Sequence, residues 1–231
     1  MADDKREYIG DSKIHQRLAG QTRGELNQPS QAQLRRAKAQ AMQQTMFAIP
    51  IAQNATVSPE QQERKVIYDL EIPQIYNFRF AVRQLKLENR RAEKFQRPLS
   101  VLIVGFPELP LIKDKFSSHA ADACIKEIGK ALVEYVELGI DIVCRFADEK
   151  FMVVLPELNG PEATMVAESI RTHFEKSLVT YQQYKIPIRA SIGITCFPKH
   201  GQSWKELVAK ADLAVDLVVE SGGNAFRFGP L

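Results

Sequence analysis

The chain of 231 residues contains no long hydrophobic run, and this absence excludes an integral membrane protein, since a helix that spans a bilayer needs about 20 apolar residues. Its first ten residues, MADDKREYIG, lack the apolar stretch of a secretory signal. Cysteine is scarce, and Cys124, Cys144 and Cys196 are an odd number at wide spacing, which argues against a disulfide framework. We therefore expect a protein of the reducing cytoplasm with no membrane span.

Aromatic residues are almost missing from residues 1–65, which nevertheless carry the whole formal net charge of +3. This segment has 10 Lys or Arg against 7 Asp or Glu, whereas residues 66–231 have 21 of each. It also has 11 Gln, and its only aromatic residues are Tyr8 and Phe47. Such a composition cannot bury enough apolar surface to fold alone. The sequence therefore predicts a basic, Gln-rich N-terminal arm at 1–65 and a folded domain at 66–231.

Two stretches of the arm are candidates for binding. Residues 31–44 are rich in helix formers and follow Pro29 and Ser30, which together predict a helix with a weak apolar face around a basic cluster. This helix is a solvated linker, a docking helix for a protein, or a contact for nucleic acid or an anionic surface. A net charge of +3 is small beside the basic footprint of nucleic-acid binders, and this argues against nucleic acid as the partner. Residues 45–60 are apolar but broken by prolines, so they indicate an extended segment that packs on something. The residues expected to contact a protein partner or large assembly are Leu34, Arg35, Arg36, Met42, Phe47, Ile49 and Ile51.

From residue 66 onward, hydrophobic periodicity predicts alternating strands and helices. Gly193 marks a bulge or a close approach within a strand. Strands joined by a helix should be parallel with right-handed crossovers, and the one tight hairpin should be antiparallel. The predicted fold is an α/β sandwich with a ferredoxin-like βαββαβ core and an extra αβ unit. Helices are expected at 75–95, 120–138, 161–178 and 203–223, and strands at 99–105, 140–146, 151–156, 186–197 and 224–228. Ser203, followed by Glu206, is the predicted N-terminal cap of the last helix.

Four motifs carry a resemblance to a known family. CRFADEKFMVVLP (144–156) resembles the signature hairpin of GGDEF domains, the diguanylate cyclases. IYNFRF (75–80), SIGIT (191–195) and KADLAVDLVVESGGN (210–224) are similar to the first helix, a central strand and the last helix of that family. The resemblance covers about residues 69–228. It implies a cyclase-palm α/β sandwich and a role in bacterial cyclic di-GMP signalling.

The chemistry of this family is the condensation of two GTP into cyclic di-GMP. It uses Mg²⁺ held by carboxylates, because a hard cation prefers oxygen ligands. The resemblance places the family's metal-binding Asp of the first strand at Gly105, its phosphate-binding Lys and Arg at Val219 and Gly223, and its guanine-reading Asn and Asp at Lys113 and Asp122. The two ends of its inhibitory product site fall on Leu138 and Asp141. The signature itself reads Ala147, Asp148, Glu149, Lys150 and Phe151.

These departures predict a degenerate site that is not an enzyme. Only Glu149 stands where a metal ligand belongs, and only Asp122 remains as a weak nucleotide contact, so we expect no metal and no cofactor. We also expect Asp148 and Lys150 at an exposed hairpin tip, where substitution changes stability little. The functional hypothesis is a non-catalytic scaffold or regulatory protein that binds its partner through residues 1–65. The alternative is a sensor of a guanine nucleotide or cyclic di-GMP.

Overall fold

The computed structural model of the chain describes residues 64–231. The seven residues expected to bind a partner, all between positions 34 and 51, lie outside the described residues. The described elements are α4 (Phe78–Phe95), β1 (Leu99–Gly105), α5 (Leu109–Lys115), α6 (Ser118–Val133), β2 (Ile142–Ala147), β3 (Lys150–Pro156), α7 (Gly160–Lys176), β4 (Leu178–Tyr181), β5 (Tyr184–Pro187), β6 (Ser191–Phe197), α8 (Trp204–Glu220) and β7 (Phe226–Phe228).

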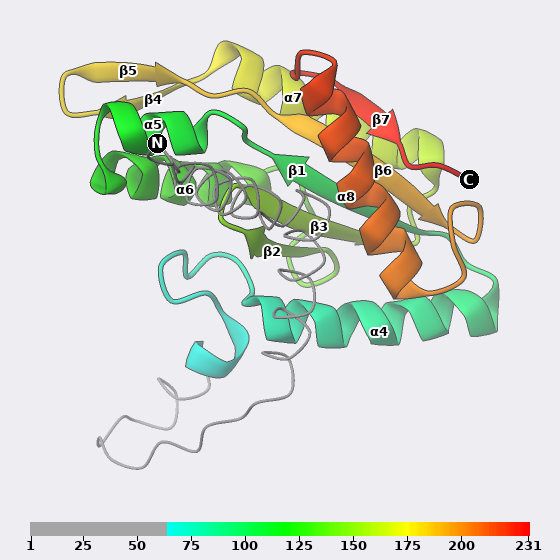
Figure 1. The fold of residues 1–231 in the computed structure, drawn as a ribbon. Coiled ribbons are helices and arrows are strands. Elements are labelled where there is room, and N and C mark those ends of the chain that lie inside the picture. Colours follow the sequence, from blue (N-terminus) through cyan, green and yellow to red (C-terminus); the bar gives the residue numbers. More distant parts are fainter. Residues whose placement is uncertain (1–63) are drawn as a thin grey trace, which may run out of the picture. The chain divides into compact units, whose positions relative to one another are not determined.

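The main sheet has five strands in the order β2-β3-β1-β6-β7 (Figure 1). β3 is antiparallel to β1 and β2, β1 is antiparallel to β6, and β6 is parallel to β7. Strands that follow one another through a helix therefore run in the same direction, and the β2–β3 hairpin is antiparallel. The predicted ferredoxin-like core with an extra αβ unit is confirmed.

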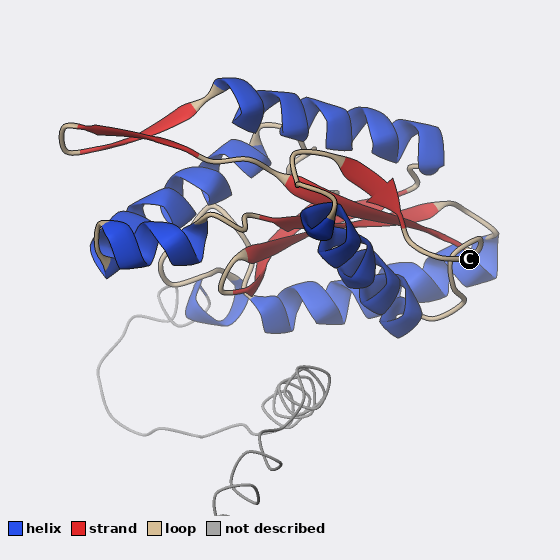
Figure 2. Ribbon diagram, turned by 45° about the horizontal axis from the view of Figure 1, so that its top comes forward, coloured by secondary structure: helices blue, strands red, loops and turns tan. Residues whose placement is uncertain are grey.

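Helices cover both faces of this sheet, as Figure 2 shows. α4 and α8 lie on one face, and α6 and α7 lie on the other. Every residue of β1 and β6 is buried, which is what continuous apolar strands adopt when both of their faces are covered. The same arrangement buries a core formed by α6, α7 and the strands between them.

Polar side chains fix where the helices begin. Asn77, Ser117 and Ser203 each accept a hydrogen bond from a backbone N–H in the first turn of α4, α6 and α8. α7 begins with a full capping box, in which the side chains of Asn159 and Glu162 each accept a backbone N–H of the other residue. The cap predicted at Ser203 is therefore confirmed.

Gly193 is a point of close approach and not a bulge. The β1–β6 register runs through it without a break. A Cβ at this position would lie 1.9 Å from the carbonyl oxygen of Ala211 on α8. Only glycine lets α8 pack this closely on the central strands.

Two parts of the fold differ from the prediction. The segment 186–197, expected as one strand, forms β5 and β6, because β5 pairs with β4 in a separate two-stranded sheet. α5 is an additional helix of seven residues, with a proline at its start, and it is too short to show helical periodicity in the sequence. None of the helices within residues 64–231 is both long and apolar enough to span a bilayer.

Candidate functional site at the β2–β3 hairpin

The signature residues form the tight connection between β2 and β3. Ala147 pairs with Lys150, and the register shifts between Arg145 and Ala147. Ala147 and Asp148 are exposed, whereas Glu149 is half-buried and its carbonyl oxygen accepts the N–H of Phe106 at 2.8 Å. This bond ties the hairpin to the chain that leaves β1.

Phe151 has a structural role. Its side chain is fully buried, and its ring meets that of Phe106 edge-on, with centroids 6.0 Å apart. The hairpin therefore rests on the core directly behind its turn.

Gly105 lies at the centre of the site, because it pairs with Lys150 on β3 and with Ser191 on β6. α8 crosses this end of β1. A Cβ built on Gly105 would lie 2.7 Å from Cγ1 of Val215 and 3.6 Å from the carbonyl oxygen of Ser191. A carboxylate at position 105 would therefore require Val215 to move.

Lys150 does not lie at an exposed tip, and that prediction is wrong. Its side chain is only 14% exposed, because it turns back from the hairpin onto α8. Its Nζ donates to Oδ1 of Asp212 at 2.5 Å and to Oδ1 of Asp216 at 3.0 Å. Burial alone lowers the pKa of Lys150, but the hydrogen bonds and charges of the two aspartates outweigh it and raise this pKa above its ordinary value.

Sequence reasoning missed both aspartates as partners of Lys150. Asp212 and Asp216 are four residues apart on α8, so they share one face of the helix. This spacing was a signal for a paired carboxylate site. Nothing in the sequence showed that the face would meet the hairpin.

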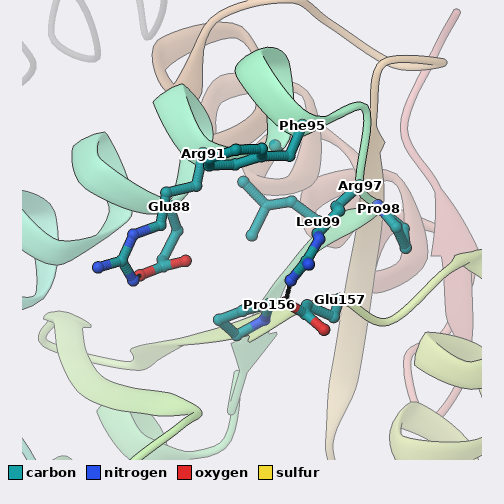
Figure 3. Close-up of a pocket in the computed structure, with 9 residues that line it drawn as sticks. Glu88, Arg91, Phe95, Arg97, Pro98, Leu99, Pro156 and Glu157 are labelled. Carbon is teal, nitrogen blue, oxygen red and sulfur yellow. Dashed lines mark hydrogen bonds and ion pairs between the residues drawn. The ribbon is translucent and has the colours of Figure 1, made fainter.

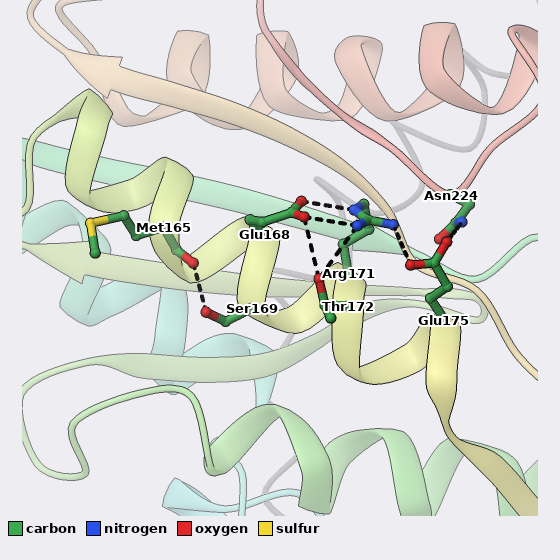
Figure 4. Close-up of polar contacts among 7 residues, drawn as sticks. All are labelled: Met165, Glu168, Ser169, Arg171, Thr172, Glu175 and Asn224. Atoms are coloured by element: carbon green, nitrogen blue, oxygen red, sulfur yellow. Dashed lines mark hydrogen bonds and ion pairs between the residues drawn. The ribbon is translucent and has the colours of Figure 1, made fainter.

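The loop that follows α8 is held by a side chain of α7 (Figure 4). The side-chain amide of Asn224 donates to Glu175 at 2.9 Å, and the guanidinium of Arg171 bridges Glu175 and Glu168. The amide of Asn224 and the guanidinium of Arg171 together lower the pKa of Glu175. This network anchors Asn224, the residue after Gly223, where the resemblance places a phosphate-binding arginine.

The remaining predicted contacts do not gather at the hairpin. Lys113 and Asp122 are exposed on α5 and α6, and within residues 64–231 neither makes a hydrogen bond or ion pair with the signature residues. Val219 is exposed near the end of α8.

The two product-site positions also lie apart from the hairpin, in the loop before β2. Leu138 is 69% exposed, whereas Asp141 is buried and its Oδ2 accepts the N–H of Glu137 at 2.8 Å. Burial raises the pKa of Asp141. The carboxylate of Asp141 therefore stabilises the loop between Glu137 and β2.

With this geometry described, comparison with known proteins identifies the family. Residues 68–225 match the family model described as "Diguanylate cyclase, GGDEF domain", so the chain belongs to the GGDEF family. It is 29% identical over 153 residues to the response regulator PleD of Caulobacter vibrioides, covering 65% of this chain and 34% of PleD. It is 28% identical over 149 residues to diguanylate cyclase A of Treponema denticola, covering 64% of this chain and 40% of that enzyme. The chain thus spans between about a third and two fifths of the length of these curated relatives.

A solved structure shows the same fold. The diguanylate cyclase SiaD of Pseudomonas aeruginosa, in complex with its activator SiaC, superposes with a TM-score of 0.66 at 21% identity. The match covers 94% of this chain and 81% of SiaD.

These comparisons contradict the prediction that the chain is not an enzyme. The family model and the relative from Treponema denticola are both described as diguanylate cyclases, and they point to an enzyme of this type. The prediction inferred a loss of catalytic activity from each replaced side chain. Replacements at individual positions do not show that catalysis is lost.

The family's reaction uses a magnesium ion, and the residues at this site differ from those that would hold it. Gly105 supplies no carboxylate and Val215 fills the space for one, while the amino group of Lys150 lies between the two nearest carboxylates of α8. Within the part of the chain that the structure describes, no three His, Cys, Asp or Glu residues are grouped to hold a metal. These residues do not fit the magnesium site that the resemblance implies.

Lys150→Met tests the role of the lysine in stability. Removing the ammonium takes away the group that bridges Asp212 and Asp216, whose side chains are 36% and 28% exposed. Breaking a fully buried pair costs about 3–5 kcal/mol, and the partial exposure of the aspartates reduces this to roughly 1–3 kcal/mol. We expect this loss in the free energy of unfolding measured by urea denaturation.

Asp148→Ala is the matched control, because Asp148 is exposed in the same turn. Its expected effect lies within about 0.5 kcal/mol. Lys150→Arg keeps the charge and should lose less than Lys150→Met. Equal stabilities for Lys150→Met and Asp148→Ala would contradict the structural role of Lys150.

Proposed function

We propose that this GGDEF-family protein acts in cyclic di-GMP signalling in the cytoplasm and binds a protein partner through residues 1–65. The observation that carries the proposal is the contrast between the two parts of the chain. The described domain has an extensive hydrophobic core of its own, whereas the sequence of residues 34–51 has clustered apolar side chains close to Arg35 and Arg36.

A partner-binding segment and a cyclase-type domain are compatible in one protein. One example is SiaD, a diguanylate cyclase whose structure was solved in complex with its activator SiaC. In the present chain, the three cysteines are buried and unpaired, which fits a reducing compartment.

The triple variant Phe47→Ala, Ile49→Ala and Ile51→Ala in the full chain tests this proposal. Burying each of these side chains contributes about 1.5–3 kcal/mol, and alanine keeps only a small part of that. We expect the variant to bind the partner at least ~100-fold more weakly, since 1.4 kcal/mol corresponds to a factor of ten. The partner is first identified by mass spectrometry of the native complex, and binding is then measured with both purified proteins.

Gln43→Ala with Gln44→Ala is the matched control, because it changes the same arm without removing apolar surface. This control should bind like the original chain, and all three proteins should unfold at the same temperature. Unchanged binding by the triple variant would place the partner surface elsewhere.

Nucleotide binding without a metal is a second candidate, favoured by one buried hydroxyl. Ser191 Oγ is buried and has no hydrogen-bond partner within residues 64–231. A Cβ on Gly223 would lie 3.2 Å from it, so this hydroxyl lies beside the position that matches a phosphate-binding residue of the family.

Calorimetric titration with GTP and with cyclic di-GMP, each in the presence of a chelator, tests whether the chain binds a nucleotide without a metal. It predicts saturable heat that weakens about tenfold or more in Ser191→Ala, because a hydrogen bond to a charged group contributes about 1.5–3 kcal/mol. Assay of the same samples with Mg²⁺ for cyclic di-GMP shows whether bound GTP is converted. Absence of saturable heat with both nucleotides would eliminate this candidate.

A further inference from the structure

The exposed side of α4 carries a row of positive charges. Of the 18 residues of this helix, six are Lys or Arg and two are Glu. Four of the basic residues follow one another at spacings of four, three and four positions, which places them within about 60° of the helix circumference and along about 16 Å of its axis. All four are exposed, and we call them the α4 basic row: Arg79, Arg83, Lys86 and Arg90.

Two cations at the centre and end of this row have no anionic partner. Within residues 64–231, the guanidinium groups of Arg83 and Arg90 form no hydrogen bond or ion pair. Arg91, in contrast, donates to Glu88 at 2.7 Å, and both of these residues line a cavity of about 250 Å³ at the end of α4 (Figure 3). The basic row therefore lies on a different side of α4 from its neutralised charges.

The excess of positive charge in the domain is confined to this part of the chain. Residues 66–231 have 21 basic and 21 acidic residues, and residues 98–231 have 14 basic against 17 acidic. An anionic partner is therefore attracted to the side of the domain that carries α4 and repelled by the rest. This asymmetry gives the domain a fixed orientation toward a negatively charged surface.

The single tryptophan of the chain lies beside the basic row. Trp204 begins α8 and is half-buried, and the ammonium groups of Lys86 and Lys205 lie over its ring, 5.1 and 5.8 Å from the centroid. The side chain of Asn89 donates to the carbonyl oxygen of Gln202 at 3.1 Å, which joins α4 to the start of α8 (Figure 1). The basic row and the start of α8 therefore form one continuous surface.

The chemistry of this surface matches the headgroup layer of an anionic bilayer. Lys and Arg side chains bind lipid phosphates there, and tryptophan is enriched at the same depth. Single-stranded nucleic acid would need open aromatic faces on which its bases stack, whereas two ammonium groups lie over the ring of Trp204. The apolar side of α4 is buried in the domain, so the helix can adsorb to a bilayer without inserting into it.

We propose that the α4 basic row and Lys205 bind the surface of a bilayer that contains anionic lipids. The guanidinium and ammonium groups pair with lipid phosphates, and Trp204 lies at the level of the headgroups. Because charge supplies the affinity, binding is reversible and weakens as the salt concentration rises. This inference is separate from partner binding by residues 1–65, since every residue that carries it belongs to the described domain.

Co-sedimentation of the full chain with vesicles tests the proposal. The chain should bind vesicles of phosphatidylglycerol and phosphatidylcholine in equal amounts, and it should not bind vesicles of phosphatidylcholine alone. Each basic residue near an anionic bilayer strengthens adsorption about fivefold. Arg83→Gln with Arg90→Gln should therefore weaken binding about 25-fold.

Lys126→Gln with Lys176→Gln is the matched control for charge. It removes two exposed positive charges from α6 and α7, on the opposite face of the sheet from α4. Charges farther from the bilayer than a Debye length are screened, so this variant should bind within about twofold of the original chain. Equal unfolding temperatures of the three proteins show that the comparison is made between folded chains.

The fluorescence of Trp204 reports which surface faces the bilayer, because the chain has no other tryptophan. A lipid with a spin label on its headgroup should quench this fluorescence in the original chain and in the control. The variant with Arg83→Gln and Arg90→Gln should lose the quenching at the same lipid concentration.

Four outcomes would overturn the proposal. They are equal binding to the two kinds of vesicle, equal weakening by the two pairs of substitutions, bound protein whose Trp204 is not quenched, and binding to duplex DNA or polyglutamate without binding to anionic vesicles. The last outcome would assign the basic row to a nucleic acid or an acidic protein.

Discussion

The ammonium group of Lys150, held between Asp212 and Asp216, is the interaction on which the site depends. It joins the β2–β3 hairpin to α8, two elements that are distant in sequence. The same helix places Val215 over Gly105 and Ala211 against Gly193. One helix therefore sets the shape of this end of the sheet through one ionic and two steric contacts.

The fold was largely predictable because its signals are local and repeated. Apolar runs identified the buried strands, helical periodicity identified the long helices, and Ser203 marked the start of α8. The β4–β5 hairpin and α5 were missed because they are short and partly exposed, so neither has a pattern that differs from a loop.

The site was less predictable because its contacts join residues that are far apart in sequence. The sequence located the turn between β2 and β3 correctly. The side chain of Lys150, however, was expected in solvent and lies against α8 instead. Charge alone could not show this, since Asp212 and Asp216 could equally have faced water. The prediction about catalysis failed for a different reason. It inferred a loss of activity from replaced side chains, whereas the family model and one curated relative are described as diguanylate cyclases and point to an enzyme.

The central claim is that Lys150 and the α8 carboxylates stabilise the fold as a coupled group. A double-mutant cycle with Lys150→Met and Asp212→Asn, read by urea denaturation, measures this coupling directly. The account predicts a coupling free energy of about 1 kcal/mol or more, because each single change removes the same hydrogen-bonded ion pair. Additive effects within about 0.3 kcal/mol would show that Lys150 and Asp212 act independently, and would contradict the account.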